Sequence, residues 1–285
     1  MASKRIVVAG GSGFLGSRIC KSAVARGWDV VSISRHGEPA WDTVSSSAQA
    51  PGWASRVKWE KADILNPSSY AAYLKGASAV VHSMGILLEA DYKHLLQGRG
   101  SLATGLQRLF GCGTPAANQP SSTLGEGGRI DTRGRLTYGV MNRDSAVMLA
   151  RKASEEKVPT FVYISAAVGT PIIPNGYIQS KREAESIISS ELPDLRSIFI
   201  RPTFMYDSSR KPTLPIALGG IIGSEVNALI GGRLSFLGMM VEKPLKADVV
   251  GEAVVESIYN DETKGVVGPK RIEELATKSW RRSML

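Results

Sequence analysis

Cysteine and histidine are scarce in this sequence. Its 285 residues include two cysteines, Cys20 and Cys112, and three histidines. Two cysteines are too few for a disulfide scaffold or for a four-cysteine zinc site. No HExxH pair is present, which disfavours a zinc hydrolase. A chain of this length buries enough surface to fold without such cross-links, and we expect no metal site.

Acidic residues are outnumbered by basic ones. The 35 lysines and arginines exceed the 26 aspartates and glutamates, so the formal net charge is +9. Such an excess favours acidic partners. The basic residues form small clusters rather than one long run, and no RNA-binding motif with interleaved aromatics is present. We therefore expect no nucleic acid as a partner, and we consider phosphorylated ligands and an anionic membrane surface instead.

The sequence also lacks a long uninterrupted hydrophobic run. Its most apolar stretch, residues 213–232, is broken by Ser224, Glu225 and Asn227. A central glutamate costs about 2.5–3.5 kcal/mol in a bilayer, so we expect no spanning helix there. The first four residues lead directly into an apolar run. This start predicts neither a secretory signal nor a long transit peptide.

Short apolar runs alternate with helical stretches over the first two thirds of the chain. The predicted strands are Arg5–Ala9, Asp29–Ser34, Val57–Ala62, Ala79–Ser83, Thr160–Ser165 and Ser197–Arg201. The predicted helices are Phe14–Arg26, Pro67–Leu74, Met141–Glu156 and Lys181–Ser190, the last beginning a little earlier. This alternation is typical of the α/β class and predicts a Rossmann-like, doubly wound parallel sheet.

The pattern predicts a single domain over residues 1–285. Residues 1–210 would form the nucleotide-binding core. Residues 98–135 are rich in Gly, Ser, Thr and Pro, and we expect this insertion to be flexible, because long loops without secondary structure are functional or disordered. Residues 211–285 begin with an apolar, glycine-rich stretch and would form a small C-terminal lid over the substrate.

A glycine-rich turn lies between the first predicted strand and the first predicted helix. Its sequence from residue 9 to residue 16 is AGGSGFLG. Glycines in this position let the backbone turn tightly and approach a pyrophosphate, whose charge meets the amino end of the helix. The strand before it and the helix after it favour dinucleotide binding over a merely flexible turn. The predicted contacts are Gly10, Ser12, Gly13, Phe14, Leu15 and Gly16.

The end of the second strand indicates which dinucleotide binds. A carboxylate there would accept a hydrogen bond from the adenosine ribose, whereas a cation would attract a 2′-phosphate. Here Ser34 and Arg35 come first, and no acid precedes Glu38. We predict NADP(H) rather than NAD(H), although Arg35 could instead be a solvated surface arginine. Asp63 and Ile64 are predicted at the adenine edge. The predicted contacts of the nicotinamide ribose are Ser83, Met84 and Gly85.

A tyrosine and a lysine four residues apart suggest catalysis. Tyr177 and Lys181 would share one helical face, where the lysine would lower the pKa of the phenol so that it can shuttle a proton. Ser165 ends the fifth strand and could hold a substrate carbonyl. Asn142 lies on the preceding helix, where its amide could anchor a water beside the lysine. The alternative is a surface Tyr/Lys pair with an unrelated strand-end serine.

One set of residues resembles the motifs of the short-chain dehydrogenase/reductase superfamily, of the extended or atypical type: Gly10, Gly13, Gly16, Ser165, Tyr177 and Lys181. The resemblance covers nearly the whole chain, including Arg201-Pro202 before Tyr206. It implies that Tyr177 and Lys181 also contact the nucleotide, together with Pro202 and Phe204. Asp207 departs from the pattern, because a glycine usually follows the tyrosine of this motif.

Three segments resemble one particular group within this superfamily. Val80–Glu89, Met141–Ala146 and Gly176–Glu185 are similar to the fungal mitochondrial atypical member of the coenzyme Q (ubiquinone) biosynthesis complex, and more distantly to the NADPH-binding accessory subunit of respiratory complex I. The resemblance implies a peripheral protein on the matrix side of the inner mitochondrial membrane. Its partners would be other coenzyme Q biosynthesis proteins, and its small-molecule ligand a quinone-like or prenylated compound.

Two functions remain open at this stage. The chain is an NADP(H)-dependent oxidoreductase acting on a quinone or prenylated phenolic intermediate, or it is a non-catalytic subunit in which the nucleotide is structural. A third function, nucleotide-sugar epimerase, is disfavoured by the apolar character of the C-terminal third.

Overall fold

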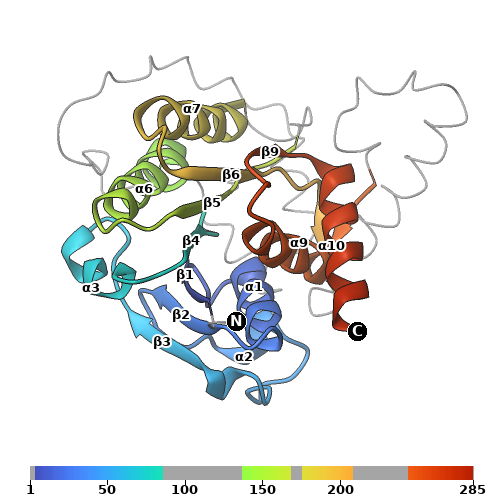
Figure 1. Cartoon of the computed structure of the whole chain (residues 1–285). Helices are drawn as coiled ribbons and strands as arrows, with labels where there is room; N and C mark the ends of the chain where they lie inside the picture. The colour runs from blue at the N-terminus through green and yellow to red at the C-terminus, as the bar shows by residue number, and fades with distance from the viewer. Residues whose placement is uncertain (1–3, 86–136, 168–174, 208–242, 285) are drawn as a thin grey trace, which may run out of the picture.

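A seven-stranded parallel sheet forms the centre of the protein (Figure 1). The computed structural model describes residues 4–85, 137–167, 175–207 and 243–284. In spatial order, the strands are β3 (Val57–Lys61), β2 (Asp29–Ser34), β1 (Arg5–Ala9), β4 (Ala79–His82), β5 (Thr160–Ile164), β6 (Arg196–Ile200) and β9 (Gly265–Val267). A second, two-stranded sheet pairs β7 (Met205–Tyr206) with β8 (Leu245–Lys246).

Helices cover both faces of the sheet, as Figure 1 shows. One face packs against α1 (Phe14–Ala25), α9 (Ala247–Tyr259) and α10 (Pro269–Ser283). The other face packs against α3 (Ala71–Leu74), α6 (Ser145–Glu155) and α7 (Asn175–Glu191). Each face buries its own hydrophobic cluster, so the central strands carry apolar side chains on both sides. This is the pattern expected of a parallel sheet. The α/β, Rossmann-like fold class is confirmed.

The strands lie close to the positions predicted from the sequence. All six predicted strands form, and each end lies within one residue of its predicted position. The predicted helix Pro67–Leu74 is instead a 3₁₀ turn, η2 (Pro67–Ser69), followed by α3. The predicted helix Met141–Glu156 begins with a π-helical segment, η3 (Gly139–Asp144). The sequence pattern did not predict β9, because three residues are too few to show a period.

The connections of the sheet change direction between β1 and β4. These strands are neighbours, with Ala9 opposite His82. The chain leaves β1 through α1 on one face, and it returns to β5 through α6 on the other. Ligands of such sheets bind where the two connections diverge, at the carboxyl ends of the strands. The predicted site residues follow the carboxyl ends of β1 to β6, with Asn142, Tyr177 and Lys181 on helical elements beside that edge.

Two regions singled out in the sequence lie wholly or largely outside the described residues. The insertion 98–135 and the apolar stretch 213–232 are both among them. Within the described parts of the chain, no helix is long and apolar enough to cross a membrane.

Candidate functional site

The glycine turn is held in a shape that needs glycine. Gly10 has a φ of +81°, and a Cβ atom there would lie 2.7 Å from Cγ of Met84. The N–H of Gly13 donates to the carbonyl oxygen of Gly10 at 2.9 Å and closes the turn. Gly13 is then the N-cap of α1, in an extended conformation. A positive φ strains residues with a Cβ atom, so only glycine can occupy position 10 without strain.

Gly16 brings the first turn of α1 against the strand. A Cβ atom at this position would overlap the carbonyl group of Gly10. The first turn of α1 carries no acidic side chain, and Ser12, Gly13 and Phe14 are partly exposed at the carboxyl edge of the sheet. The amino end of a helix carries partial positive charge and orients N–H groups outward. The pyrophosphate contacts assigned to this turn stay predictions, with which the exposed amino end of the helix is consistent. Leu15, in contrast, is a buried core residue.

The end of β2 presents one exposed cation. Arg35 is exposed and forms no hydrogen bond or ion pair with any part of the chain that the structure describes. The hydroxyl of Ser34 donates to the carbonyl oxygen of Gly37 at 2.9 Å. Ser34 therefore shapes the turn after β2, and Arg35 is the residue available to a phosphate. Both assignments stay predictions.

The residues after β3 differ in exposure. Asp63 is exposed, and its Oδ1 accepts from the N–H of Leu65 at 3.0 Å. Ile64 is 5% exposed and belongs to the core cluster on the α6 and α7 face. The side chain of Ile64 is therefore occupied by packing. The adenine contacts assigned to Asp63 and Ile64 stay predictions.

Three elements converge at the end of β4. The hydroxyl of Ser83 donates to the carbonyl oxygen of Ala9 at 2.8 Å, which ties this segment to β1. A Cβ atom on Gly85 would lie 2.9 Å from Oδ1 of Asn142 and 3.1 Å from Nζ of Lys181. The segment after β4, η3 and α7 thus bring Gly85, Asn142 and Lys181 together. The sequence predicted each of these residues separately, and the fold places them side by side.

Lys181 is enclosed by strand β5. Its side chain is buried, with 3% of the residue exposed. Nζ donates to the carbonyl oxygen of Ile164 at 2.7 Å. It also lies 4.8 Å from the ring centre of Tyr163 and 5.8 Å from that of Tyr177. A cation over aromatic faces is stabilised by their negative potential. The predicted Tyr177–Lys181 pair is therefore a real spatial pair.

Burial sets the protonation of this pair. It lowers the pKa of the Lys181 ammonium to about 7, and the guanidinium of Arg182 lowers that pKa further while Glu185 opposes it. Burial raises the pKa of the Tyr177 phenol to about 12, with Tyr138 adding to the rise and Arg182 opposing it. The prediction that lysine lowers the phenol pKa is thus wrong for the protein alone. A buried amine near its pKa is a weak source of positive charge.

Asn142 is held from two sides in the π-helical segment. It is fully buried, and its Nδ2 donates to Oγ of Ser180 at 3.3 Å. The hydroxyl of Tyr163 donates to its carbonyl oxygen. A π-helical turn shifts the backbone hydrogen bonds by one residue, and such turns often occur at functional sites. Asn142 therefore has a fixed position beside Lys181.

His82 supports the same segment from β4. Its Nε2 lies 2.9 Å from Oγ of Ser145, and that hydroxyl donates to the carbonyl oxygen of Met141 at 2.8 Å. Because the serine proton is engaged, Nε2 must be the protonated nitrogen of His82. Burial lowers the pKa of His82 to about 3, so the ring stays neutral. The sequence did not predict that His82 and Tyr163 support η3, since both follow the pattern of ordinary strand residues.

Ser165 is engaged by an arginine that sequence reasoning missed. Ser165 is 3% exposed, and its Oγ accepts from Nη1 of Arg182 at 3.0 Å. Within the described part of the chain, no hydrogen bond joins Ser165 to Tyr177, so that predicted proximity stays a prediction. Arg182 follows Lys181 directly, and its adjacency to the Tyr/Lys motif was the only available signal.

The segment after β6 is buried against its neighbours. Pro202 is buried and its carbonyl oxygen accepts from the N–H of Ala167 at 2.9 Å. Phe204 is half-buried. Asp207 forms an ion pair with Nη2 of Arg18 on α1, with Oδ1 at 3.0 Å. The aspartate that departs from the expected motif thus has a specific basic partner. The nucleotide contacts assigned to Pro202 and Phe204 stay predictions.

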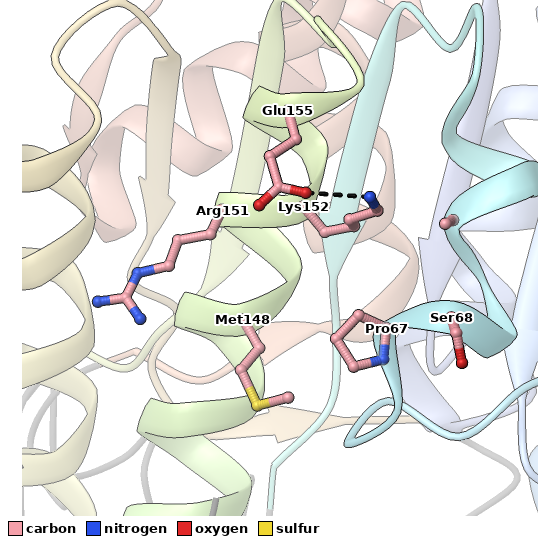
Figure 2. Close-up of a pocket in the computed structure, with 7 residues that line it drawn as sticks. Pro67, Ser68, Met148, Arg151, Lys152 and Glu155 are labelled. Atoms are coloured by element: carbon pink, nitrogen blue, oxygen red, sulfur yellow. Dashed lines mark hydrogen bonds and ion pairs between the residues drawn. The ribbon is translucent and has the colours of Figure 1, made fainter. Parts of the chain in front are cut away.

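One surface hollow lies apart from these residues. It has a volume of about 540 Å³ and lies between η2 and α6, where Figure 2 shows Pro67, Met148 and Arg151 at its wall. None of the predicted site residues lines it. Among the described residues, no cluster of His, Cys, Asp and Glu could hold a metal ion. The candidate site consists of the glycine turn, the ends of the strands, η3 and α7.

Comparison with known proteins finds a matching family and two similar proteins. Residues 6–91 match the NAD dependent epimerase/dehydratase family. MIOREX complex component 2 of Saccharomyces cerevisiae is 36% identical over 284 residues, which cover 92% of this chain and 96% of that protein. An uncharacterized chloroplastic protein of Arabidopsis thaliana is 25% identical over 97% of this chain and 78% of its own length.

Solved structures share the fold. The Bordetella bronchiseptica enzyme WbmG in complex with NAD has a TM-score of 0.54 and 12% identity, over 99% of this chain and 78% of that one. UDP-glucuronic acid 4-epimerase from Bacillus cereus in complex with NAD has a TM-score of 0.54 and 15% identity, over 93% and 76%. At this level of identity the likeness extends to the fold and not to the substrate.

Proposed function

Because this chain belongs to the NAD-dependent epimerase/dehydratase family of short-chain-dehydrogenase-like proteins, we propose that it is an NADP(H)-dependent oxidoreductase. The observation that carries the proposal is the convergence of Lys181, Asn142 and Gly85 beside the glycine turn, with Tyr177 next to Lys181. The proposal is supported by a phenol, a buried amine and the glycine turn lying at one edge of the sheet. A bound nicotinamide dinucleotide supplies or accepts the hydride.

The protein's own residues handle the proton. With a pKa of about 12, the phenol of Tyr177 is protonated at neutral pH. It can donate its proton to the carbonyl oxygen of a substrate, which takes up the C=O π electron pair when hydride bonds to the carbon framework. Lys181, with a pKa of about 7, can pass a replacement proton toward the phenol. Asn142 fixes the environment of the amine, because its amide oxygen and Nζ both border Gly85. Ser165 would hold the substrate oxygen.

Arg35 supports the choice of NADP(H) over NAD(H). It is an exposed cation directly after β2, where a 2′-phosphate would lie. We expect Arg35→Asp to weaken NADPH binding at least about tenfold, because a charge-assisted contact contributes about 1.5–3 kcal/mol. NADH affinity should be unchanged.

Calorimetric titration of both nucleotides checks the cofactor assignment. Arg56→Asp is the matched control, since Arg56 is exposed at the start of β3, at the opposite edge of the sheet. Equal affinity of the native protein for NADPH and NADH would overturn the assignment.

The substrate class rests on the resemblance of Val80–Glu89, Met141–Ala146 and Gly176–Glu185 to the coenzyme Q biosynthesis protein. We propose a quinone or prenylated phenolic intermediate as substrate and other coenzyme Q biosynthesis proteins as partners. The protein would act on the matrix side of the inner mitochondrial membrane. Its basic excess suits an anionic membrane surface.

Tyr177→Phe tests the catalytic assignment. Removing only the hydroxyl should leave folding and NADPH affinity unchanged, while hydride transfer to a short-chain ubiquinone analogue should fall by roughly 100- to 10,000-fold, the range for loss of a general acid. The measurement is the oxidation of NADPH followed by absorbance. Tyr73→Phe is the control, because its hydroxyl donates to Glu60 at 3.0 Å outside the site. Native rates in Tyr177→Phe would refute this role.

A non-catalytic role is the second candidate. It is favoured by the name of the yeast relative, MIOREX complex component 2, which identifies that protein as part of a complex. If the native protein binds the nucleotide yet transfers no hydride to any quinone or phenolic acceptor, the nucleotide is structural. Mass spectrometry of the co-purifying nucleotide, with its redox state before and after adding acceptors, separates the two candidates.

A further inference from the structure

Arg182 makes three hydrogen bonds to the segment that follows β5. Its Nη1 donates to Oγ of Ser165 at 3.0 Å. Its Nη2 donates to the carbonyl oxygens of Ala166 at 2.8 Å and Ala167 at 2.6 Å. One guanidinium on α7 therefore holds three consecutive residues that follow β5. A planar guanidinium presents several donors in a fixed geometry, so these contacts hold both the segment and the side chain.

Glu185 holds the guanidinium itself, and Arg201 in turn holds Glu185. Nη1 of Arg182 forms an ion pair with Oε1 of Glu185 at 3.0 Å. Glu185 is 5% exposed, and its carboxylate also accepts from Arg201 at the end of β6. Breaking a buried charge pair leaves an uncompensated charge, so this chain of contacts resists rearrangement. Arg182 is thus positioned by α7 and β6 together.

The contact determines what the Ser165 hydroxyl can still do. Because Oγ accepts from a cation, a lone pair of Ser165 is occupied. Among the described residues, the hydroxyl proton of Ser165 has no acceptor. A hydroxyl that already accepts a charge-assisted bond is polarised as a donor. Ser165 is therefore prepared to donate to a ligand oxygen rather than to accept from one.

The charge of Arg182 acts on the rest of the site. Its guanidinium stays protonated at any physiological pH, whereas burial makes Lys181 only partly protonated near neutrality. Arg182 interacts electrostatically with Lys181, Tyr177 and Tyr163. The lasting positive charge beside the phenol is therefore that of the arginine.

We propose that Arg182 is a positioning residue of the site, which fixes the Ser165 hydroxyl as a donor and supplies the permanent positive charge beside Tyr177 and Lys181. This proposal rests on the proposed function for its catalytic meaning. Its two physical parts, the hold on Ser165 and the charge, can be measured without turnover.

The first experiment measures the titration of Lys181 by nuclear magnetic resonance in protein labelled with ¹³C-lysine, with Lys181→Met used to assign the signal. The groups around Lys181 are Arg182 and Glu185 on α7, His82 on β4, Tyr163 on β5 and Tyr177. Arg182→Met removes one positive charge, so the pKa of Lys181 should rise by at least about 0.5. Arg182→Lys keeps the charge and should restore the native titration.

Arg151→Met is the matched control for charge loss. Arg151 pairs with Glu191 at the far end of α7 and touches no site residue. It should leave the titration of Lys181 unchanged. A residue that only stabilises the fold would not move this titration. If Lys181 titrates identically in the native protein and in Arg182→Met, the charge role is wrong.

The second experiment is a double-mutant cycle on urea unfolding with Ser165→Ala and Arg182→Met. If the arginine holds the serine, the two losses in stability should not add, because residues in contact are coupled. Additive losses would overturn the positioning role. Arg182→Lys combined with Ser165→Ala serves as the second cycle and keeps the test valid if Arg182→Met unfolds.

Failure of the proposed function has a different signature. A native protein that binds nucleotide but transfers no hydride would refute the oxidoreductase, while the titration and the cycle would still decide the role of Arg182. If turnover is found, Arg182→Met should lower kcat and shift its pH profile, and Arg182→Lys should restore the profile. Native kcat and pH profile in Arg182→Met would overturn the proposal.

Discussion

Burial opposes ionisation at both members of the Tyr/Lys pair. Lys181 loses hydration in the core, and Tyr177 lies between Tyr138, at 6.2 Å between ring centres, and the buried amine. The amine is therefore easily deprotonated and the phenol is hard to deprotonate. Without ligands, the pair is close to neutral just above pH 7. Substrate or nucleotide charge then has a large influence on which residue holds the proton.

The lowered pKa of Lys181 makes stability depend on pH. Between about pH 7 and pH 10.5, the unfolded chain holds a proton that folded Lys181 has released. Raising the pH therefore favours the folded state, by up to about 1.4 kcal/mol per pH unit. We expect Lys181→Met to remove this rise in the unfolding free energy between pH 7 and pH 10. It should also stabilise the nucleotide-free protein below pH 7.

Urea unfolding of the nucleotide-free protein across this pH range measures the effect. Lys264→Met is the control, because Lys264 is exposed and makes no side-chain contact among the described residues. The interpretation fails if Lys181→Met and the native protein show the same dependence on pH.

The ion pair between Arg18 and Asp207 joins elements at the scale of the fold. Arg18 lies on α1, which begins at the glycine turn, and Asp207 follows β7. Their side chains are 10% and 11% exposed. Arg18 also donates to Oγ of Ser17 at 3.0 Å and to the carbonyl oxygen of Val44, the last residue of α2 (Trp41–Val44). Arg18 therefore connects the helix that follows the glycine turn to two segments distant in sequence.

Asp207→Gly, which introduces the residue usual at this position of the motif, removes the carboxylate that lies 3.0 Å from Arg18. Removing one member of a buried pair typically costs about 3–5 kcal/mol, so we expect a loss of at least about 2 kcal/mol for this slightly exposed pair. The double variant Arg18→Met/Asp207→Gly should recover part of that loss, because no buried charge remains unpaired.

Chemical unfolding of the two single variants and the double variant completes the measurement. Lys21→Met is the comparison, since Lys21 pairs with Asp248 on the surface between α1 and α9. Surface pairs contribute little, so its effect should stay below about 1 kcal/mol. An equal loss in Asp207→Gly and in the double variant would contradict a coupled pair.

Charge is the dominant property at the scale of the whole molecule. The net charge is +9, and the last turns of α10 carry Lys278, Arg281 and the exposed Trp280. Basic residues near an anionic surface contribute about 1 kcal/mol each, and tryptophan is favoured at the membrane interface. This end of α10 is the described part of the protein best suited to such a surface.

We expect the protein to float with cardiolipin-containing liposomes at low salt and not with neutral ones. Binding should fall as salt is raised, because screening weakens these contacts. Lys278→Glu/Arg281→Glu should abolish flotation. Lys61→Glu/Lys75→Glu changes the net charge equally on exposed residues of β3 and the end of α3, and it should retain most binding. The absence of flotation in the native protein at low salt would refute membrane attachment.

The sequence by itself determined the layers of the fold and identified most of the candidate site residues. Strand β1 and strand β2 lie where apolar runs predicted them, because a buried parallel strand must be apolar on both faces. The glycine turn could also be predicted from the sequence, since Gly10 and Gly16 occupy positions that exclude a Cβ atom. These signals are local, and each can be read from a few neighbouring residues.

Only the tertiary structure decided which residues act on one another. The contact of Arg182 with Ser165 joins residues 17 positions apart, and the contact of Tyr163 with Asn142 joins residues 21 apart. Periodicity cannot show such pairs, because they depend on how β5, η3 and α7 pack. The pKa of Lys181 depends in the same way on burial, a property of the folded chain. The sequence therefore identified the chemical groups of the candidate site, and the packing of the fold determined their hydrogen-bond partners and their protonation.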